Sequence, residues 1–98
     1  MPYALRARLE PSLPWHSDAT VLVVDDDEGV RELAEVTFQR AGLRVLLARD
    51  GREGLALFRR HADEIQAVVL DRTMPTISGD TVFEEIRRTR PNTAIVLT

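Results

Sequence analysis

The stretch TVLVVDDD at residues 20–27 joins a short apolar run to three consecutive acidic residues. A second apolar run, AVVL at residues 67–70, is also followed by an acidic residue, Asp71. Short runs rich in β-branched residues are typical of buried parallel strands. The carboxyl ends of such strands line a common crevice in an open α/β sheet. If the two strands are neighbours, Asp25, Asp26 and Asp71 are predicted to converge there.

Three carboxylates in one small cleft repel one another. They stay ionised together only beside a cation or a basic side chain. All-oxygen ligation with open positions suits Mg²⁺, which keeps several waters and binds phosphate oxygens. The sequence therefore predicts a Mg²⁺ site at the ends of the two strands. The alternative is that an acidic residue here only caps the following helix, and we prefer that interpretation for Asp27 and Glu28.

The rest of the chain alternates between strand and helix patterns. Strands are expected at residues 20–24, 43–48, 67–70 and 94–97. Three amphipathic helices are expected between them, with these apolar residues: Val30, Leu33, Ala34, Phe38 and Ala41 on the first; Leu55, Phe58 and Ala62 on the second; Val82, Phe83 and Ile86 on the third. The order β-α-β-α-β-α-β predicts an α/β fold with a doubly wound parallel sheet.

Length and composition restrict the class of protein. The 98 residues allow one domain, and 44% hydrophobic with 30% charged residues is typical of a globular protein. A net charge of −3 gives no basic footprint for direct nucleic-acid binding. The absence of cysteine excludes a disulfide framework and a thiol nucleophile. No apolar run reaches membrane-spanning length and no signal-peptide pattern is present, so we expect a cytoplasmic location without membrane contact by this segment.

The start of the chain differs from the rest. Residues 1–19 include Pro2, Pro11 and Pro14, which interrupt helices. We therefore predict a linker or tail at residues 1–19 and a single domain at residues 20–98. That domain would be incomplete, because the fourth strand has the pattern of a buried strand but no covering element follows it. An exposed apolar edge strand invites pairing with another chain, so self-association through this edge is a further expectation.

These motifs resemble the receiver domain of bacterial response regulators. Residues 21–27 look like the family's first strand and acidic pair, and LDRTMP at residues 70–75 looks like its phosphoacceptor strand and D-x-x-M-P loop. Residues 76–79 are similar to the turn that follows, and residues 94–98 to a fourth strand ending on a switch hydroxyl. The resemblance covers residues 19–98. Residues 61–65 and 71–75 are similar to receivers that follow the kinase core of hybrid sensor histidine kinases.

The resemblance implies a flavodoxin-like sheet of order 2-1-3-4, truncated so that the family's fifth βα unit and its phosphoryl-binding Lys are missing. It implies that Asp71 accepts a phosphoryl group from a histidine kinase or a phosphotransfer domain. Asp25, Asp26, Asp71 and the main-chain carbonyl of Thr73 would hold Mg²⁺. The Thr98 hydroxyl would bind a phosphoryl oxygen, and the Thr73 side chain would tune phosphoryl lifetime. The chain would be a phosphoprotein of a two-component phosphorelay and not an enzyme.

Other interpretations remain open for these residues. Asp71 could only cap a turn, Thr98 could be a frayed terminal residue, and Thr73 could be a loop residue without a role. A Mg²⁺-dependent phosphohydrolase of the haloacid-dehalogenase type also uses an Asp nucleophile at a strand end. That family requires a second acidic residue at the position of Thr73, and it requires a Lys. This sequence has Thr at that position and contains no Lys. A nucleotide-binding domain that uses Asp25 to bind a ribose should carry a G-x-G-x-x-G motif after its first strand. This sequence has no such motif there.

Overall fold

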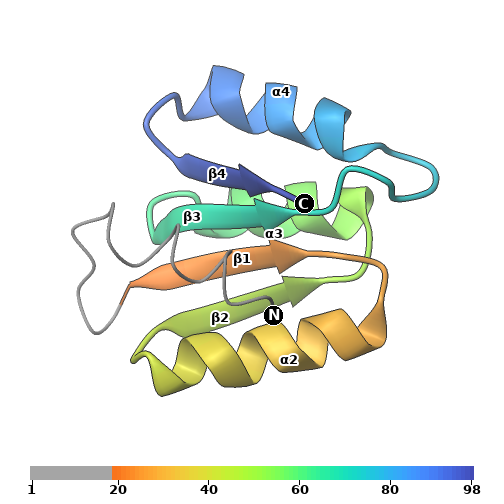
Figure 1. Cartoon of the computed structure of the whole chain (residues 1–98). Helices are drawn as coiled ribbons and strands as arrows, with labels where there is room; N and C mark the ends of the chain where they lie inside the picture. Colours follow the sequence, from red (N-terminus) through yellow and green to blue (C-terminus); the bar gives the residue numbers. More distant parts are fainter. Residues whose placement is uncertain (1–18) are drawn as a thin grey trace.

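A computed structural model describes residues 19–98 of the chain. Its strands are β1 (Thr20–Val24), β2 (Arg44–Ala48), β3 (Ile65–Leu70) and β4 (Ala94–Leu97), and its helices are α2 (Glu28–Arg40), α3 (Gly51–His61) and α4 (Gly79–Thr89). The strands are parallel and form one sheet of order β2-β1-β3-β4 (Figure 1). The predicted α/β fold and its strand order are confirmed.

Helices cover both faces of this sheet. On one face, Ala34 and Phe38 of α2 pack into a buried cluster with side chains of β1, β3 and β4. On the other face, α3 and α4 contribute Phe58 and Ile86 to a second cluster. Figure 1 shows α3 behind the strands, away from α2. The sheet is therefore the middle layer, and its carboxyl edge remains open to the loops that follow each strand.

Side-chain caps fix where the helices begin. The Asp27 carboxylate accepts the N–H of Val30 at 3.1 Å, and the Asp50 carboxylate accepts the N–H of Glu53 at 2.8 Å. Ser78 caps α4 in the same way. These side chains satisfy N–H groups that have no partner within the helix. Capping by Asp27, one of two residues predicted for this role, leaves Asp25 and Asp26 available for other contacts.

Part of the predicted core is exposed. Val30 and Leu33 were predicted on the buried stripe of the first helix, but they are 36% and 52% exposed. On α2 only Ala34 and Phe38 are buried. Among the described helices, α3 and α4 both pack on the opposite face of the sheet, so the flank of α2 that carries Val30 and Leu33 has no helix beside it. The exposed residue Ala41 caps the end of α2 rather than joining its stripe.

The predicted tail falls almost entirely outside the described residues, which begin at Ala19. Ala19 itself is only 2% exposed and belongs to the cluster under α2. Its carbonyl accepts the N–H of Arg44 at 2.8 Å. The packed core therefore includes one residue that the sequence assigned to the tail. Within residues 19–98, none of the helices has the length and apolar character needed to cross a bilayer.

Candidate phosphoryl and metal site

The register of the sheet brings three strand ends to one level. Val24 lies opposite Leu70, and Leu70 lies opposite Leu97. The N–H of Asp71 donates to the Val24 carbonyl at 2.9 Å, and the N–H of Thr98 donates to the Leu70 carbonyl at 2.9 Å. The backbone pairing thus continues one residue past β3 and β4. It places Asp71 between the end of β1 and Thr98, whose side chain is exposed.

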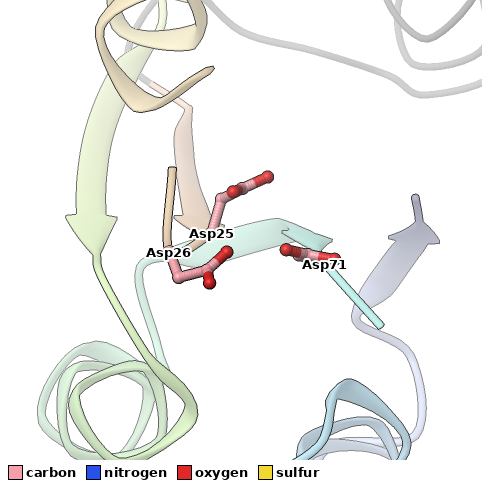
Figure 2. Close-up of side chains that lie close together, drawn as sticks. All are labelled: Asp25, Asp26 and Asp71. Carbon is pink, nitrogen blue, oxygen red and sulfur yellow. The ribbon is translucent and has the colours of Figure 1, made fainter. Parts of the chain in front are cut away.

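Asp25, Asp26 and Asp71 form the acid cluster of this edge. One carboxylate oxygen from each lies within 4.8 Å of the others. Figure 2 shows Asp25 and Asp26 leaving the end of β1 and Asp71 reaching toward them from the end of β3. Asp26 is exposed, whereas Asp25 and Asp71 are half-buried. The structure thus brings together the three carboxylates that the sequence singled out.

The surroundings of Asp25 disfavour its ionised form. Burial raises the pKa of Asp25, and the negative charges of Asp71, Asp26 and Asp27 raise it further. The N–H of Asp27, which donates to Asp25 Oδ1 at 2.9 Å, acts in the opposite direction and lowers this pKa. A cation held between the carboxylates would offset this repulsion. The donor set consists of oxygens with free lone pairs, so it fits a hard cation such as Mg²⁺.

The Asp71 carboxylate is oriented by its own loop. Its Oδ1 accepts two hydrogen bonds from Thr73, one from the main-chain N–H and one from the hydroxyl, both at 2.9 Å. Asp side chains commonly accept such bonds from residues two positions ahead. The bonds fix the plane of the carboxylate and leave Oδ2 available. The predicted role of the Thr73 carbonyl as a metal ligand is not tested by these contacts.

A close approach of two backbones fixes the rest of the loop. A Cβ at Gly79 would lie 2.3 Å from the carbonyl oxygen of Asp71 and 2.6 Å from Cα of Arg72. Any other residue at this position would therefore push the start of α4 away from Asp71. Met74 anchors the middle of the loop in the core, where it is 6% exposed. The loop that follows Asp71 is thus packed closely against the candidate nucleophile.

Arg31 is a residue of this site that the sequence analysis missed. It lies one turn into α2, and its Nη1 donates to the main-chain carbonyl of Asp25 at 2.8 Å. A lone arginine on a helix ordinarily indicates a solvated face. One available signal was its position, since a positive charge near the N-terminus of a helix opposes the helix dipole and needs compensation.

Comparisons with known proteins identify a family and relatives that the chain resembles. Residues 21–98 match the response regulator receiver domain family. The uncharacterized transcriptional regulatory protein YrkP of Bacillus subtilis is 43% identical over 68 residues, which cover 69% of this chain and 28% of YrkP. The sensor histidine kinase AtsR of Burkholderia thailandensis is 43% identical over 86 residues, which cover 86% of this chain and 14% of AtsR. The chain therefore spans less than a third of either relative.

Solved structures share the same fold. A response regulator receiver domain protein from Clostridium thermocellum superposes with a TM-score of 0.78 at 30% identity, over 81% of this chain and 63% of that one. The response regulator TrrA of Thermotoga maritima, solved in complex with Mg²⁺ and beryllofluoride, gives a TM-score of 0.71 at 37% identity, over 81% of this chain and 67% of TrrA.

Proposed function

Since this chain belongs to the response regulator receiver domain family, we propose that it accepts a phosphoryl group on Asp71 from a histidine kinase or a phosphotransfer domain. The receiver domain is a signalling module of two-component systems. The observation that carries the proposal is the convergence of Asp25, Asp26 and Asp71 at one edge of the sheet. The relatives include a sensor histidine kinase, which supports the finer proposal that the chain is the receiver of a hybrid kinase.

The transfer follows from the groups around Asp71. Its Oδ2 attacks the phosphorus of a phosphohistidine, a P–O bond forms, and the P–N bond to the imidazole breaks. The released imidazole nitrogen takes up a proton. Both hydrogen bonds from Thr73 end on Oδ1, so neither of them occupies the attacking oxygen. The product is an acyl phosphate on Asp71.

We propose that Asp25, Asp26, Asp71 and the main-chain carbonyl of Thr73 hold Mg²⁺. When bound, the ion supplies positive charge that offsets the charge of the phosphoryl oxygens. TrrA, whose structure contains Mg²⁺ and beryllofluoride, supports this assignment. The raised pKa of Asp25, which burial causes first and the neighbouring carboxylates of Asp71, Asp26 and Asp27 increase, supports it as well.

Two threonines complete the proposed site. The Thr98 hydroxyl would donate to a phosphoryl oxygen, and the sheet register that sets Thr98 beside Asp71 supports this role. The Thr73 side chain would govern the lifetime of the phosphoryl group. In the structure its hydroxyl donates to Asp71 Oδ1. Phosphorylation of Asp71 would therefore alter the carboxylate that the Thr73 hydroxyl contacts.

We also propose that β4 takes part in self-association. It is an edge strand of the described sheet, and Ile95 and Leu97 on it are only half-buried. Free edges with apolar side chains pair readily with other chains. Light scattering across a concentration series measures this, and a monomer at every concentration would reject it.

Phosphorylation by acetyl phosphate in the presence of Mg²⁺ tests the proposed function. The expected result is a mass gain of one phosphoryl group per chain, localised to Asp71 by peptide mapping. Asp71→Asn removes the nucleophile and should abolish the gain, whereas the matched control Asp63→Asn, an exposed acid outside the site, should keep it. A label that persists in Asp71→Asn contradicts the assignment. Steady release of phosphate without a labelled chain favours a phosphohydrolase instead.

A further inference from the structure

We propose that Arg31 is a positioning residue of the metal site, which holds the peptide between Asp25 and Asp26 in the orientation that metal binding requires. This inference rests on the proposed function, because it concerns the same carboxylates. With this role, α2 not only covers one face of the sheet but also orients residues of the metal site.

Asp25 is held at three atoms. Its N–H donates to the Ala48 carbonyl of β2 at 3.0 Å, and its Oδ1 accepts the N–H of Asp27 at 2.9 Å. Its main-chain carbonyl accepts Nη1 of Arg31 at 2.8 Å, in a partly buried contact. Among the described backbone hydrogen bonds outside the regular elements, none ends on this carbonyl. Arg31 therefore supplies the contact that fixes it.

Fixing this carbonyl fixes both neighbouring acids. The carbonyl belongs to the peptide unit that links Asp25 to Asp26, and a peptide unit is a rigid plane. Its orientation is coupled to ψ of Asp25 and φ of Asp26, so it constrains the directions in which the Cα–Cβ bonds of the two residues leave the backbone. Mg²⁺ demands near-octahedral ligand geometry, so a small rotation of this plane would misplace two ligands together.

The contact acts mainly through geometry rather than through charge. The guanidinium of Arg31 donates to a main-chain carbonyl, and none of the ion pairs between described residues includes Arg31. Its charge also lies in the first turns of α2, where the helix dipole disfavours it. A lysine would keep the charge but would lack the rigid planar fork of the guanidinium.

Mg²⁺ titrations of the full 98-residue chain test this role. The variants are Arg31→Gln and Arg31→Lys, and the matched control is Arg40→Gln, which removes the same charge from the exposed end of α2. Affinity is measured by calorimetry and by amide chemical shifts, and thermal melts are recorded without metal. Loss of an orienting contact typically weakens metal binding by about 10–100-fold.

We expect Arg31→Gln to weaken Mg²⁺ binding by roughly tenfold and Arg40→Gln to stay within about twofold of the parent. The affinity of Arg31→Lys should fall between those of Arg31→Gln and the parent.

Equal affinity of Arg31→Gln and Arg40→Gln would overturn the inference while leaving the proposed function intact. A lower melting temperature with unchanged Mg²⁺ affinity would assign Arg31 a purely structural role and would also overturn it. If Arg31→Gln does not fold, parent-like affinity of Arg31→Lys would overturn it. A parent chain that binds no Mg²⁺ would reject both proposals.

Discussion

Charged side chains are arranged differently at the two ends of the sheet. At the carboxyl end, Asp25, Asp26 and Asp71 lie together, and none of the ion pairs between described residues involves them. At the amino end, arginines hold the loops that lead into β3 and β4. Arg87 donates to the carbonyls of Pro91 at 2.6 Å and Thr93 at 2.8 Å.

Arg90 adds to the amino end. It donates to the Ala62 carbonyl at 3.1 Å and pairs with Asp63 at the same distance. The hydrogen bonds to the main-chain carbonyls join donor to acceptor, so they favour the folded state. The ion pair with the exposed Asp63 contributes little. The acid cluster instead gathers like charges, which costs stability and keeps lone pairs available for a ligand. Unfavourable charge of this kind is typical of functional sites, and the same sheet separates it from the contacts that stabilise the loops.

The largest effect is expected when metal fills the acid cluster. Saturation with Mg²⁺ at a hundredfold excess over Kd should stabilise the chain by about 2.7 kcal/mol, which corresponds to roughly 10–20 °C in Tm for a domain of this size. Asp26→Ala removes one ligand and should lose most of this gain. Thermal melts with Mg²⁺ and with EDTA measure both. An equal shift in Asp26→Ala would show that the metal binds elsewhere.

The amino end should respond to loss of Arg87. This side chain is half-buried, makes two hydrogen bonds and lies 5.3 Å from the ring centroid of Phe83. Arg87→Ala should therefore lower the free energy of unfolding by about 2 kcal/mol and leave Mg²⁺ affinity unchanged. The exposed neighbour Arg88 is the control, since Arg88→Ala should cost less than about 0.5 kcal/mol. Comparable losses in both variants would remove the contrast between the two ends.

Asp25 makes the carboxyl end sensitive to pH. Because its pKa is raised in the folded state, the folded chain binds this proton more tightly than the unfolded chain. The stabilisation is present below the ordinary Asp pKa and is lost as the pH rises through the raised value. At neutral pH without metal, Asp25→Asn should therefore melt above the parent, because its amide oxygen can still accept the N–H of Asp27. The difference should vanish in acid, and a constant difference across pH would contradict the raised pKa.

Much of the fold could be predicted from sequence because its signals are local. β1 and β4 match their predicted bounds, since each is a mostly apolar run that ends directly before a polar residue. The exposure of Val30 and Leu33 could not be predicted in the same way. Periodicity identifies an apolar flank on a helix, but the neighbouring elements decide whether that flank is covered.

The acid cluster was predictable for a topological reason. Carboxyl ends of neighbouring parallel strands share one edge, so the order of the strands alone brings Asp25 and Asp71 together. The bonds from Thr73 to Asp71 and from Arg31 to the Asp25 carbonyl depend on side-chain rotamers and on the orientation of single peptides. The spacing of residues in the sequence does not specify these contacts, and the signal for Arg31 was only the position of its charge near the start of the first helix.

The smallest predicted effect concerns backbone strain in the loop that follows Asp71. Thr76 has a φ of 71°, and the N–H of Ile77 donates to the Pro75 carbonyl across it at 2.9 Å. A β-branched residue in this left-handed region is disfavoured by roughly 1–2 kcal/mol, which exceeds the entropic cost of glycine. Thr76→Gly should therefore raise the free energy of unfolding by about 0.5–1 kcal/mol. Thr76→Ala, which keeps Cβ, should gain less in denaturant melts. A glycine variant no more stable than the alanine variant would mean that the carboxyl end stores no strain at Thr76, and the contrast with the amino end would then rest on charge alone.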